Sequence, residues 1–504
     1  MVDGRHYPPT VEQQVALDYF AAGKPLRIQA GAGTGKTTTL AMLARSTPRI
    51  GTYLAFNREI ARDAGRAMPQ TVDCRTVHSV AATTISRQHP NGKALLDRLN
   101  THRVSPWQMA RHLGLGMLVV SVPQPFSPPR RKVLQPNYQA SHVMRAVNAY
   151  CQSADVEPGV QHFPYIDGID PPGEGGRRTY DNNDRVAKEL LPALQRAWAD
   201  LCSPTGQLRF NHDIYLKLWQ LGGYPIPGEF LLFDEAQDAS PVMLAALAAQ
   251  GDTQVVYVGD SCQQIYEWRG AVNAMALLDP ATPSAWLTQS WRFGPPIADV
   301  ANLILDQLDT ELCLSGTPSI PSVVHTRRLL QRPRAVLCRS NAAAVQSVLG
   351  FQERGLMPHL VGGSDDIVRF ALAAGQLQAG ETTGHPELSC FDSWREVQDY
   401  VDNDPQGSEL RMMVNVIDSY GVDIVVEALS GLIAQEEADV VVSTAHKAKG
   451  REWHSVRLAS DFEQPETGSL AAPELRLLYV AATRATHELD LSVCLPLRDL
   501  ADPA

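Results

Sequence analysis

The sequence predicts an α/β fold in which parallel β-sheets carry helices on both faces. An apolar run at 26–30 is followed by the glycine-rich stretch GAGTGK and then by an apolar helical pattern. A second apolar run, at 229–233, ends in the acidic stretch DEAQD, and a third, at 255–258, ends in Gly-Asp. Glycine or acidic residues directly after buried strands are typical of parallel sheets, whose ligands bind at the carboxyl ends of the strands.

Length and composition limit the class of protein. A chain of 504 residues exceeds the size of one hydrophobic core, so about two to four domains are expected. With 44% hydrophobic and 20% charged residues, the chain has an ordinary globular composition. The N-terminal residues lack a signal-peptide pattern, and no apolar run reaches the roughly 18 residues of a membrane span.

The eight cysteines are scattered and form no C-x-x-C pair. This spacing argues against a zinc ribbon and against a disulfide framework, and it favours a reducing, cytoplasmic setting. An iron–sulfur cluster built from distant cysteines stays an open alternative, although the usual spacings are missing.

The net charge of −11 argues against a nucleic-acid partner when it is taken alone. A polymer that runs in a groove responds to the local field, however, so global charge is a poor guide. Basic residues cluster locally at 130–132 and at 327–334. Phosphate contact and a solvated basic face are both compatible with either cluster.

The stretch after the first strand has the residues of a phosphate-binding loop. Its glycines let the backbone approach phosphate oxygens, with N–H groups and a helix N-terminus facing the anion. Lys36 is expected to reach the β- and γ-phosphates, and Thr37 to ligate Mg²⁺. Nucleotide contacts are predicted for Ala30, Gly31, Ala32, Gly33, Thr34, Gly35, Lys36, Thr37 and Thr38. Ala30 stands where the general pattern has glycine, and this is tolerable at a strand end.

The acidic stretch DEAQD supplies the second part of a nucleotide-hydrolysis site. Asp234 is predicted to hold Mg²⁺, and Glu235 to orient and deprotonate the attacking water. An acidic pair after a strand is also found in solvated loops, so its weight comes from the phosphate loop upstream.

The segment after the third strand reads GDSCQQIYEWRG. Gln263 is a candidate sensor of the γ-phosphate, while Tyr266 and Trp268 offer flat surfaces for base stacking. Stacking contributes roughly 1–3 kcal/mol per base and is indifferent to sequence. A core aromatic is the competing interpretation of Trp268.

Taken together, these motifs resemble superfamily 1A helicases of the UvrD/Rep type. AGAGTGKT resembles the Walker A motif of that family, which also begins with alanine, DEAQD resembles its Walker B motif, and VGDSCQQIYEWRGA its motif III. Within the superfamily the sequence most resembles the helicase part of F-box DNA helicases, in the stretches at 53–58, 212–218 and 393–400. The motifs begin so close to the N-terminus that no F-box is expected. The resemblance implies two RecA-like P-loop NTPase lobes that use ATP and Mg²⁺.

The resemblance also implies roles for residues outside the phosphate loop. Gln13, in a Q-motif-like stretch, is expected to contact adenine, and Trp291 to stack on it where the family usually has tyrosine. Glu452 is expected to contact the ribose. Arg292 and Arg484 are expected to act as arginine fingers, since arginine is permanently charged and forked.

DNA contacts follow from the same resemblance and from the aromatic residues. Phe56 and Trp268 are the expected stacking residues. The full set of predicted DNA contacts is Phe56, Asn57, Thr76, His78, Ser79, Tyr266, Trp268, Arg269, Arg339, Thr444 and His446. The implied partners are single-stranded DNA and junctions of single- and double-stranded DNA. The resemblance implies a motor that moves 3′→5′ along single-stranded DNA. The motor is expected to work as a monomer.

The order of the motifs predicts how the chain is divided. Lobe 1A is expected at 1–85 and 206–286, with a helical insertion 1B at 86–205. Lobe 2A is expected at 287–370 and 436–504, with a short insertion 2B at 371–435. Within 1B, the Pro/Gly-rich stretch 158–176 is predicted to be a loop. The segment 123–136 is predicted to be irregular, basic and able to approach a duplex.

The expected function is that of an ATP-dependent DNA helicase in repair, recombination or defence. Two alternatives stay open. One is a single-strand translocase that removes bound proteins and unwinds little, which the short 2B segment favours. The other is a motor subunit whose activity depends on a separate nuclease, because no nuclease motif follows the last helicase motif. RNA is a weaker alternative to DNA as the track.

Overall fold

The computed structural model describes residues 8–55, 57–100, 104–124, 127–166, 169–170, 181–266, 272–385, 387–388, 391, 393–403, 408–463 and 470–502. The predicted contacts Phe56, Trp268 and Arg269 lie outside these residues. The chain forms two compact units. Unit 1 comprises Met1–Ile28, Thr37–Gly259 and Tyr266–Ala285, and unit 2 comprises Gln29–Lys36, Asp260–Ile265 and Trp286–Ala504.

The first sheet has six strands in the order β3-β2-β6-β7-β1-β8. The strands are β1 Leu26–Ala30, β2 Gly51–Ala55, β3 Val72–Thr76, β6 Phe230–Phe233, β7 Gln254–Gly259 and β8 Ser284–Leu287. The β2–β3, β2–β6 and β6–β7 pairs are parallel. Every residue of β2, β6 and β7 is buried, as expected for central strands covered on both faces. The three strands predicted from the sequence are thus confirmed as β1, β6 and β7.

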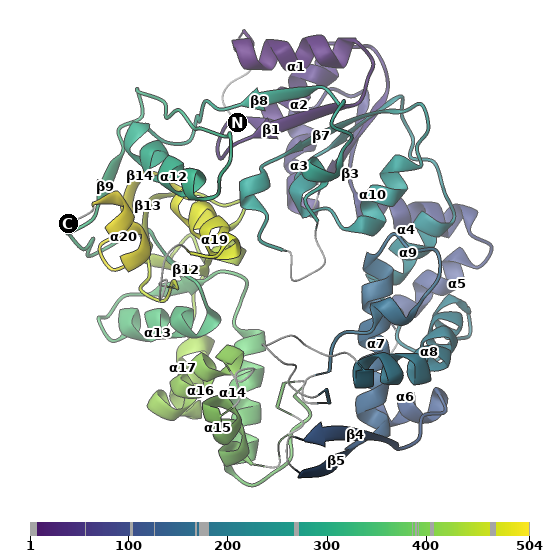
Figure 1. Cartoon of the computed structure of the whole chain (residues 1–504). Coiled ribbons are helices and arrows are strands. Elements are labelled where there is room, and N and C mark those ends of the chain that lie inside the picture. Colours follow the sequence, from purple (N-terminus) through teal and green to yellow (C-terminus); the bar gives the residue numbers. More distant parts are fainter. Residues whose placement is uncertain are drawn as a thin grey trace. The chain divides into compact units, whose positions relative to one another are not determined.

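Helices of unit 1 surround this sheet and extend from it (Figure 1). They are α1 Val11–Ala21, α2 Lys36–Arg45, α3 Arg58–Ala67, α4 Val77–Gln88, α5 Gly92–Asp97, α6 Pro106–His112, α7 Pro136–Gln152, α8 Asp181–Cys202, α9 His212–Leu221, α10 Pro241–Ala248 and α11 Ala274–Leu277. Helix α1 begins at a capping box in which Thr10 and Gln13 satisfy each other's backbone N–H groups.

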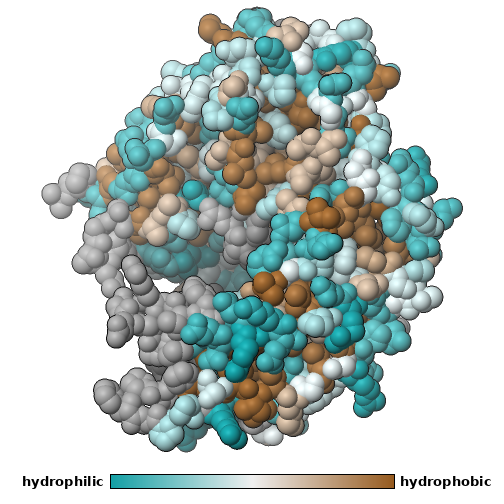
Figure 2. Space-filling model, turned by 45° about the vertical axis from the view of Figure 1, so that its right-hand side comes forward, coloured by the Kyte–Doolittle hydropathy of each residue, from teal (hydrophilic) through white to brown (hydrophobic). Residues whose placement is uncertain are grey.

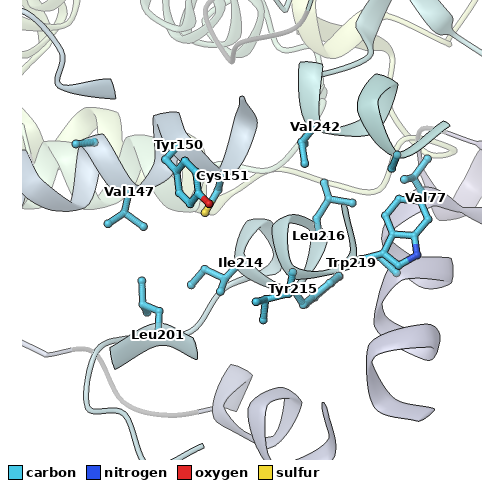
Figure 3. Close-up of a cluster of buried hydrophobic side chains, with 14 of the residues drawn as sticks. Val77, Val147, Tyr150, Cys151, Leu201, Ile214, Tyr215, Leu216, Trp219 and Val242 are labelled. Carbon is cyan, nitrogen blue, oxygen red and sulfur yellow. The ribbon is translucent and has the colours of Figure 1, made fainter. Parts of the chain in front are cut away.

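Helix α9 lies at the centre of the core of unit 1. Its residues 214–219 are all buried, and a helix that is apolar all round needs partners on every side. Figure 3 shows these side chains directed toward α4, α7, α8 and α10. Lys217 belongs to this buried run, and its ammonium donates to the carbonyl oxygens of Ser153 at 3.0 Å and Asp155 at 2.5 Å. Residues 214–218 of the stretch 212–218, noted for its resemblance to F-box helicases, therefore belong to the core.

The prediction of an irregular segment at 123–136 is wrong. Strands β4 Leu118–Gln124 and β5 Ser127–Leu134 form an antiparallel hairpin, and Pro136 is the first residue of α7. The prolines of β5 are tolerated because the ribbon has two free edges and its register shifts between Val122 and Gln124. In the neighbouring stretch 158–176, the described residues contain only the short 3-10 helix η2 Val160–His162.

The second sheet, in unit 2, also has six strands, in the order β11-β12-β10-β13-β14-β9. All five neighbouring pairs are parallel. The strands are β9 Val323–His325, β10 Ala335–Cys338, β11 Pro358–Leu360, β12 Val440–Thr444, β13 Trp453–Leu458 and β14 Ala485–Asp490. Two parallel sheets confirm the predicted α/β fold with two RecA-like lobes.

The helices of unit 2 fall into two groups in Figure 1. Helices α12 Pro295–Gln307, α13 Asn341–Gln352, α18 Ala445–Ala448, α19 Ala472–Ala482 and α20 Leu495–Ala501 accompany the sheet, whereas α14 Asp365–Gln378, α15 Trp394–Asn403, α16 Ser408–Tyr420 and α17 Val422–Ser430 gather beside it. One cluster of buried residues runs from β10 and β12 through α13 to α14–α17. The short insertion therefore shares its core with the sheet, and the predicted boundary at 370/371 falls inside α14.

The visible surface in Figure 2 has hydrophobic residues in separate patches between hydrophilic ones. Among the described helices, none is long and apolar enough to cross a membrane. Seven of the eight cysteines lie in the described part of the chain, and all seven are free thiols.

Candidate functional site

The phosphate loop joins β1 to α2 and leaves almost no room for side chains. Gly33 and Gly35 have φ angles of 73° and 82°, in the left-handed region that glycine adopts without strain. A Cβ atom on Gly33 would lie 2.6 Å from Cβ of Arg292, and one on Gly31 would lie 2.2 Å from a methyl carbon of Leu314. Ala30 is fully buried at the end of β1, so a small side chain fits there. These glycines are therefore needed for conformation and for close packing.

The segment 287–292 holds the backbone of the phosphate loop through three hydrogen bonds within unit 2. Gly31 N donates to Leu287 O at 3.1 Å, and Trp291 N donates to Gly33 O at 2.9 Å. The Ser290 hydroxyl donates to Ala32 O at 2.9 Å. Trp291 itself is 53% exposed, and its stacking on adenine stays a prediction.

Other predicted nucleotide contacts lie at the start of the chain and on α2. Both ends of the Gln13 amide have partners in unit 1: its oxygen accepts from Thr10 N at 3.0 Å, and its nitrogen donates to Thr39 Oγ1 at 3.1 Å. An adenine contact by Gln13 stays a prediction, and each end of the amide has capacity for a second hydrogen bond. Thr37 is half-buried and Thr38 is exposed.

The acidic pair stands directly after β6, with both carboxylates oriented by neighbours in unit 1. Asp234 is buried, and it accepts from the Tyr53 hydroxyl at 2.5 Å and from Glu235 N at 2.9 Å. Burial, reinforced by the charge of Asp234, raises the pKa of Tyr53, which therefore remains a hydrogen-bond donor. Gln237 donates to a carboxylate oxygen of Glu235 at 2.5 Å. Hydrogen bonds thus orient Asp234 for its predicted role as a Mg²⁺ ligand, and Glu235 for its predicted role as a proton acceptor.

Glu235 also has an unusual backbone. Its φ of 55° and ψ of 43° lie in the left-handed region, which residues with a side chain seldom adopt. Such conformations persist where the surrounding structure fixes them, and they cluster at functional sites. The strain agrees with the catalytic role predicted for this residue.

Unit 2 brings the predicted γ-phosphate sensor and the predicted second arginine finger together. Arg484, 1% exposed, places one guanidinium nitrogen 3.4 Å from the side-chain oxygen of Gln263. Its Nε donates to Val480 O at 2.8 Å, which orients the guanidinium. Lys449 Nζ donates to the main-chain oxygen of Gln263 at 2.7 Å. Gln263 is thus held by two cationic side chains that come from separate motifs.

Two further residues with predicted roles at the nucleotide are paired with each other. Arg292 donates from Nε to the carboxylate of Glu452 at 2.8 Å, and from a terminal nitrogen to Thr483 O at 3.1 Å. The arginine is mostly buried and the glutamate is mostly exposed.

Three of the predicted DNA contacts begin helices at the ends of strands. Asn57 accepts from Ile60 N at 2.9 Å, Thr76 from Ser79 N at 3.1 Å and Thr444 from Lys447 N at 3.3 Å. These side chains cap α3, α4 and α18. Backbone N–H groups at a helix N-terminus attract anions, so α3 and α4 are suited to receive DNA phosphates.

The remaining described DNA candidates have varied surroundings. His78 is half-buried, and its ring meets those of His212 and Tyr215 edge-on at 6.5 Å and 6.0 Å between centroids. The hydroxyl oxygen of Ser79 accepts a hydrogen bond from the guanidinium of Arg75 at 3.0 Å. Tyr266 and His446 are half-buried.

Arg339 is the candidate whose charge is already compensated. It forms ion pairs with Glu463 and with Glu474, the latter at 2.9 Å. A contact between Arg339 and a DNA phosphate stays a prediction.

Sequence reasoning missed Tyr53, Ser290 and Tyr479, which contact the residues discussed above or the phosphate loop. Tyr53 and Tyr479 were visible as tyrosines inside apolar runs. A buried tyrosine hydroxyl usually forms a hydrogen bond, so a tyrosine inside an apolar run indicates a polar contact in the core. The partners themselves could not be read from the sequence, because they lie far away in the chain.

Comparison with known families places these motifs in context. The family model described as "AAA domain" matches residues 13–269, which is 257 of the 504 residues. The model described as "UvrD-like helicase C-terminal domain" matches residues 439–491.

Three curated relatives show the same relationship. F-box DNA helicase protein 1 of Schizosaccharomyces pombe is 28% identical, over 96% of this chain and 57% of its own. F-box DNA helicase 1 of Gallus gallus is also 28% identical, over 96% of this chain and 49% of its own. DNA helicase II of Haemophilus influenzae is 24% identical, over 59% of this chain and 41% of its own. The chain spans about half the length of the curated relatives it matches.

The AAA-domain match covers the phosphate loop, the acidic pair and Gln263, and the C-terminal match covers Glu452 and Arg484. The two matches follow each other in the chain, as the two parallel sheets do. The chain belongs to the UvrD-like helicases of superfamily 1.

Proposed function

We propose that this chain is an ATP-driven motor that moves 3′→5′ along single-stranded DNA and separates strands at junctions with duplex. The contact between Gln263 and Arg484 carries the proposal, because it joins a γ-phosphate sensor to an arginine finger in the unit that also contains Lys36. Such an arrangement serves a motor in which the state of the nucleotide must be transmitted to another motif.

The chemistry assigned to the site is hydrolysis of the γ-phosphate of ATP. Lys36 binds the β- and γ-phosphates, and Glu235 orients and deprotonates the attacking water. Arg292 and Arg484 stabilise the charge on the transferring phosphoryl group. Asp234 and Thr37 fit Mg²⁺, which is usually held by one or two protein oxygens together with substrate phosphates. Bound Mg²⁺ neutralises charge on the phosphates.

Movement along DNA follows from the same residues. ATP draws the two lobes together through its contacts with Arg292 and Arg484, and hydrolysis lets them separate. The helix N-termini at Asn57 and Thr76, together with Thr444, bind the DNA backbone. Contacts of this kind read no base sequence, so the motor works on any strand. We propose that it acts as a monomer.

The proposed lobes follow the motifs, with lobe 1A at 1–85 and 206–286 and lobe 2A at 287–370 and 436–504. The two sheets support the division, with β8, Ser284–Leu287, extending one residue past the proposed boundary. We propose a cytoplasmic setting, which the free thiols of the described cysteines support.

A translocase that removes bound proteins and unwinds little is the second candidate. The helices α14–α17 favour it, because they share one core with β10, β12 and α13 rather than forming a domain of their own. A large insertion that controls unwinding is therefore missing from the described residues.

The deciding experiment is ATP-dependent strand displacement on duplexes that carry either a 3′ or a 5′ single-stranded tail. The proposal predicts unwinding of the 3′-tailed duplex alone, and none by Lys36→Ala. Lys24→Ala, an exposed lysine just before β1, serves as the matched control and should retain activity. DNA-stimulated ATP hydrolysis without unwinding would favour the translocase, and hydrolysis by Lys36→Ala would refute the assigned site.

A further inference from the structure

The hydroxyl of Tyr479 connects two of the segments that form the site. Tyr479 lies in α19 and is fully buried. Its hydroxyl accepts a hydrogen bond from Ala32 N of the phosphate loop at 3.2 Å, and it donates one to Asp260 Oδ2 at 3.1 Å. All three residues belong to unit 2, although more than two hundred positions separate each from the next.

Asp260 continues the connection to Gln263. Its carboxylate is completely buried and accepts from the side-chain nitrogen of Gln263 at 2.7 Å and from Cys262 N at 3.0 Å. Since the nitrogen of the Gln263 amide is bound to Asp260, the oxygen of the amide faces Arg484, at 3.4 Å. A single path of hydrogen bonds therefore runs from Ala32 through Tyr479, Asp260 and Gln263 to Arg484.

Burial determines which group donates and which group accepts along this path. Burial raises the pKa of Tyr479, so the phenol stays protonated and donates to Asp260. Burial also raises the pKa of Asp260, and the positive charge of Lys36 opposes that rise. Hydrogen bonds in a low-dielectric interior are stronger than in water, and unmatched groups there are costly. The carboxylate of Asp260 is thus sensitive both to Tyr479 and to the residue that binds the phosphates.

Phenylalanine would fill the same space in α19 without the hydroxyl. The packing of the ring therefore accounts for an aromatic residue at this position, and the two hydrogen bonds account for tyrosine. Neither contact reaches solvent, so the hydroxyl acts only through the residues that it holds.

We propose that Tyr479 is a positioning residue for ATP hydrolysis. Its hydroxyl keeps Asp260 and the amide of Gln263 in a fixed position relative to the phosphate loop. This inference rests on the proposed function, and it deepens it. Because Tyr479 is fully buried and its hydroxyl is bound to Ala32 and Asp260, its loss alters the alignment of Gln263 and Arg484 with the γ-phosphate and leaves the main nucleotide contacts in place. Turnover is therefore affected more than binding.

The test compares Tyr479→Phe with Tyr150→Phe in the full chain. Tyr150 is a fully buried tyrosine of α7 whose hydroxyl donates to Val156 O at 2.7 Å, away from the site residues, so it controls for loss of a buried hydroxyl. Steady-state ATP hydrolysis with single-stranded DNA should show kcat reduced about tenfold in Tyr479→Phe, with KM within about twofold of wild type. Tyr150→Phe should keep the wild-type kcat, and thermal melting establishes that both variants are folded.

A second variant tests the path itself. Asp260→Asn should lower kcat at least as much as Tyr479→Phe, and the double variant should be no slower than Asp260→Asn alone, because both changes break the same path. Multiplied losses in the double variant would overturn the proposal, as would wild-type turnover in Tyr479→Phe or an equal loss in Tyr150→Phe.

The proposed function and this inference fail in different ways. If the wild-type chain hydrolyses ATP and Lys36→Ala does not, a wild-type kcat in Tyr479→Phe refutes the role of Tyr479 alone. If the wild-type chain does not hydrolyse ATP, or if Lys36→Ala matches it, the proposed function and the inference fail together.

Discussion

The guanidinium of Arg292 donates to the carboxylate of Glu452 at 2.8 Å, so two residues assigned to the nucleotide neutralise each other. The pair also orients the arginine, since a second bond runs from Arg292 to Thr483 O. ATP that recruits Arg292 to its γ-phosphate must compete with Glu452 for the same positive charge.

Replacing Glu452 by glutamine should therefore strengthen ATP binding. Glutamine keeps the shape of the side chain and can still accept from a ribose hydroxyl, but it no longer holds the charge of Arg292. Because exposed ion pairs contribute up to about 1 kcal/mol, the dissociation constant for ATP should fall by up to about fivefold. Titration with a fluorescent ATP analogue measures the change.

Glu463→Gln is the matched control, because Glu463 is a similarly exposed glutamate that pairs with a different arginine, Arg339. It should leave ATP affinity unchanged. Weaker binding by Glu452→Gln would show instead that the carboxylate itself contacts the nucleotide.

The bond from Tyr53 to Asp234 predicts a change in Mg²⁺ dependence. Tyr53→Phe removes the hydroxyl that orients the proposed Mg²⁺ ligand. Loss of a group that orients a metal ligand typically lowers metal affinity 10- to 100-fold, so half-maximal ATP hydrolysis should need about tenfold more Mg²⁺. Tyr257→Phe, on β7, which pairs with β6, should keep the wild-type requirement. An unchanged Mg²⁺ curve in Tyr53→Phe would argue that Asp234 does not bind the metal.

His142 predicts how the stability of unit 1 depends on pH. The ring is buried between Tyr138 and Phe163, and burial, assisted by the charge of Arg145, lowers its pKa to about 4. In the unfolded chain the histidine has the ordinary pKa of 6.5. Between pH 6.5 and 4 the unfolded chain therefore binds a proton that the folded chain does not, and acidification favours unfolding. From pH 7.5 to pH 5, this histidine should remove about 2 kcal/mol from the free energy of unfolding.

Urea titrations at the two pH values measure this effect. His142→Phe keeps the aromatic packing but cannot bind a proton, so its loss of stability on acidification should be smaller than that of wild type by about this amount. His454→Phe is the control, since His454 is an exposed histidine that stacks on His487 at 4.3 Å. Equal acid sensitivity of His142→Phe and wild type would disprove the assignment.

The sequence was informative where local pattern decides structure. The strands β1, β6 and β7 followed from short apolar runs, and the start of α2 at Lys36 followed from the glycines before it. The same logic failed at β4 and β5. Their prolines predicted irregular chain, whereas a two-stranded ribbon has free edges and a register shift that accommodate them.

Long-range pairing lay beyond the sequence. The bonds of Tyr479 to Ala32 and Asp260 join positions that no local rule connects. The left-handed backbone of Glu235 was equally hidden, because its neighbours impose it against the preference of the residue. The candidate residues could thus be named in advance, but their partners came only from the fold.

The central position of α9 has a consequence for how this chain can be shortened or rearranged. Its buried residues rest on α4 and α10 on one side and on α7, from the predicted insertion 86–205, on the other (Figure 3). Excising that insertion would leave an apolar helix facing water and an ammonium, that of Lys217, without its two carbonyl acceptors. The insertion therefore cannot be removed without exposing the core, and a shortened variant of this chain must retain it.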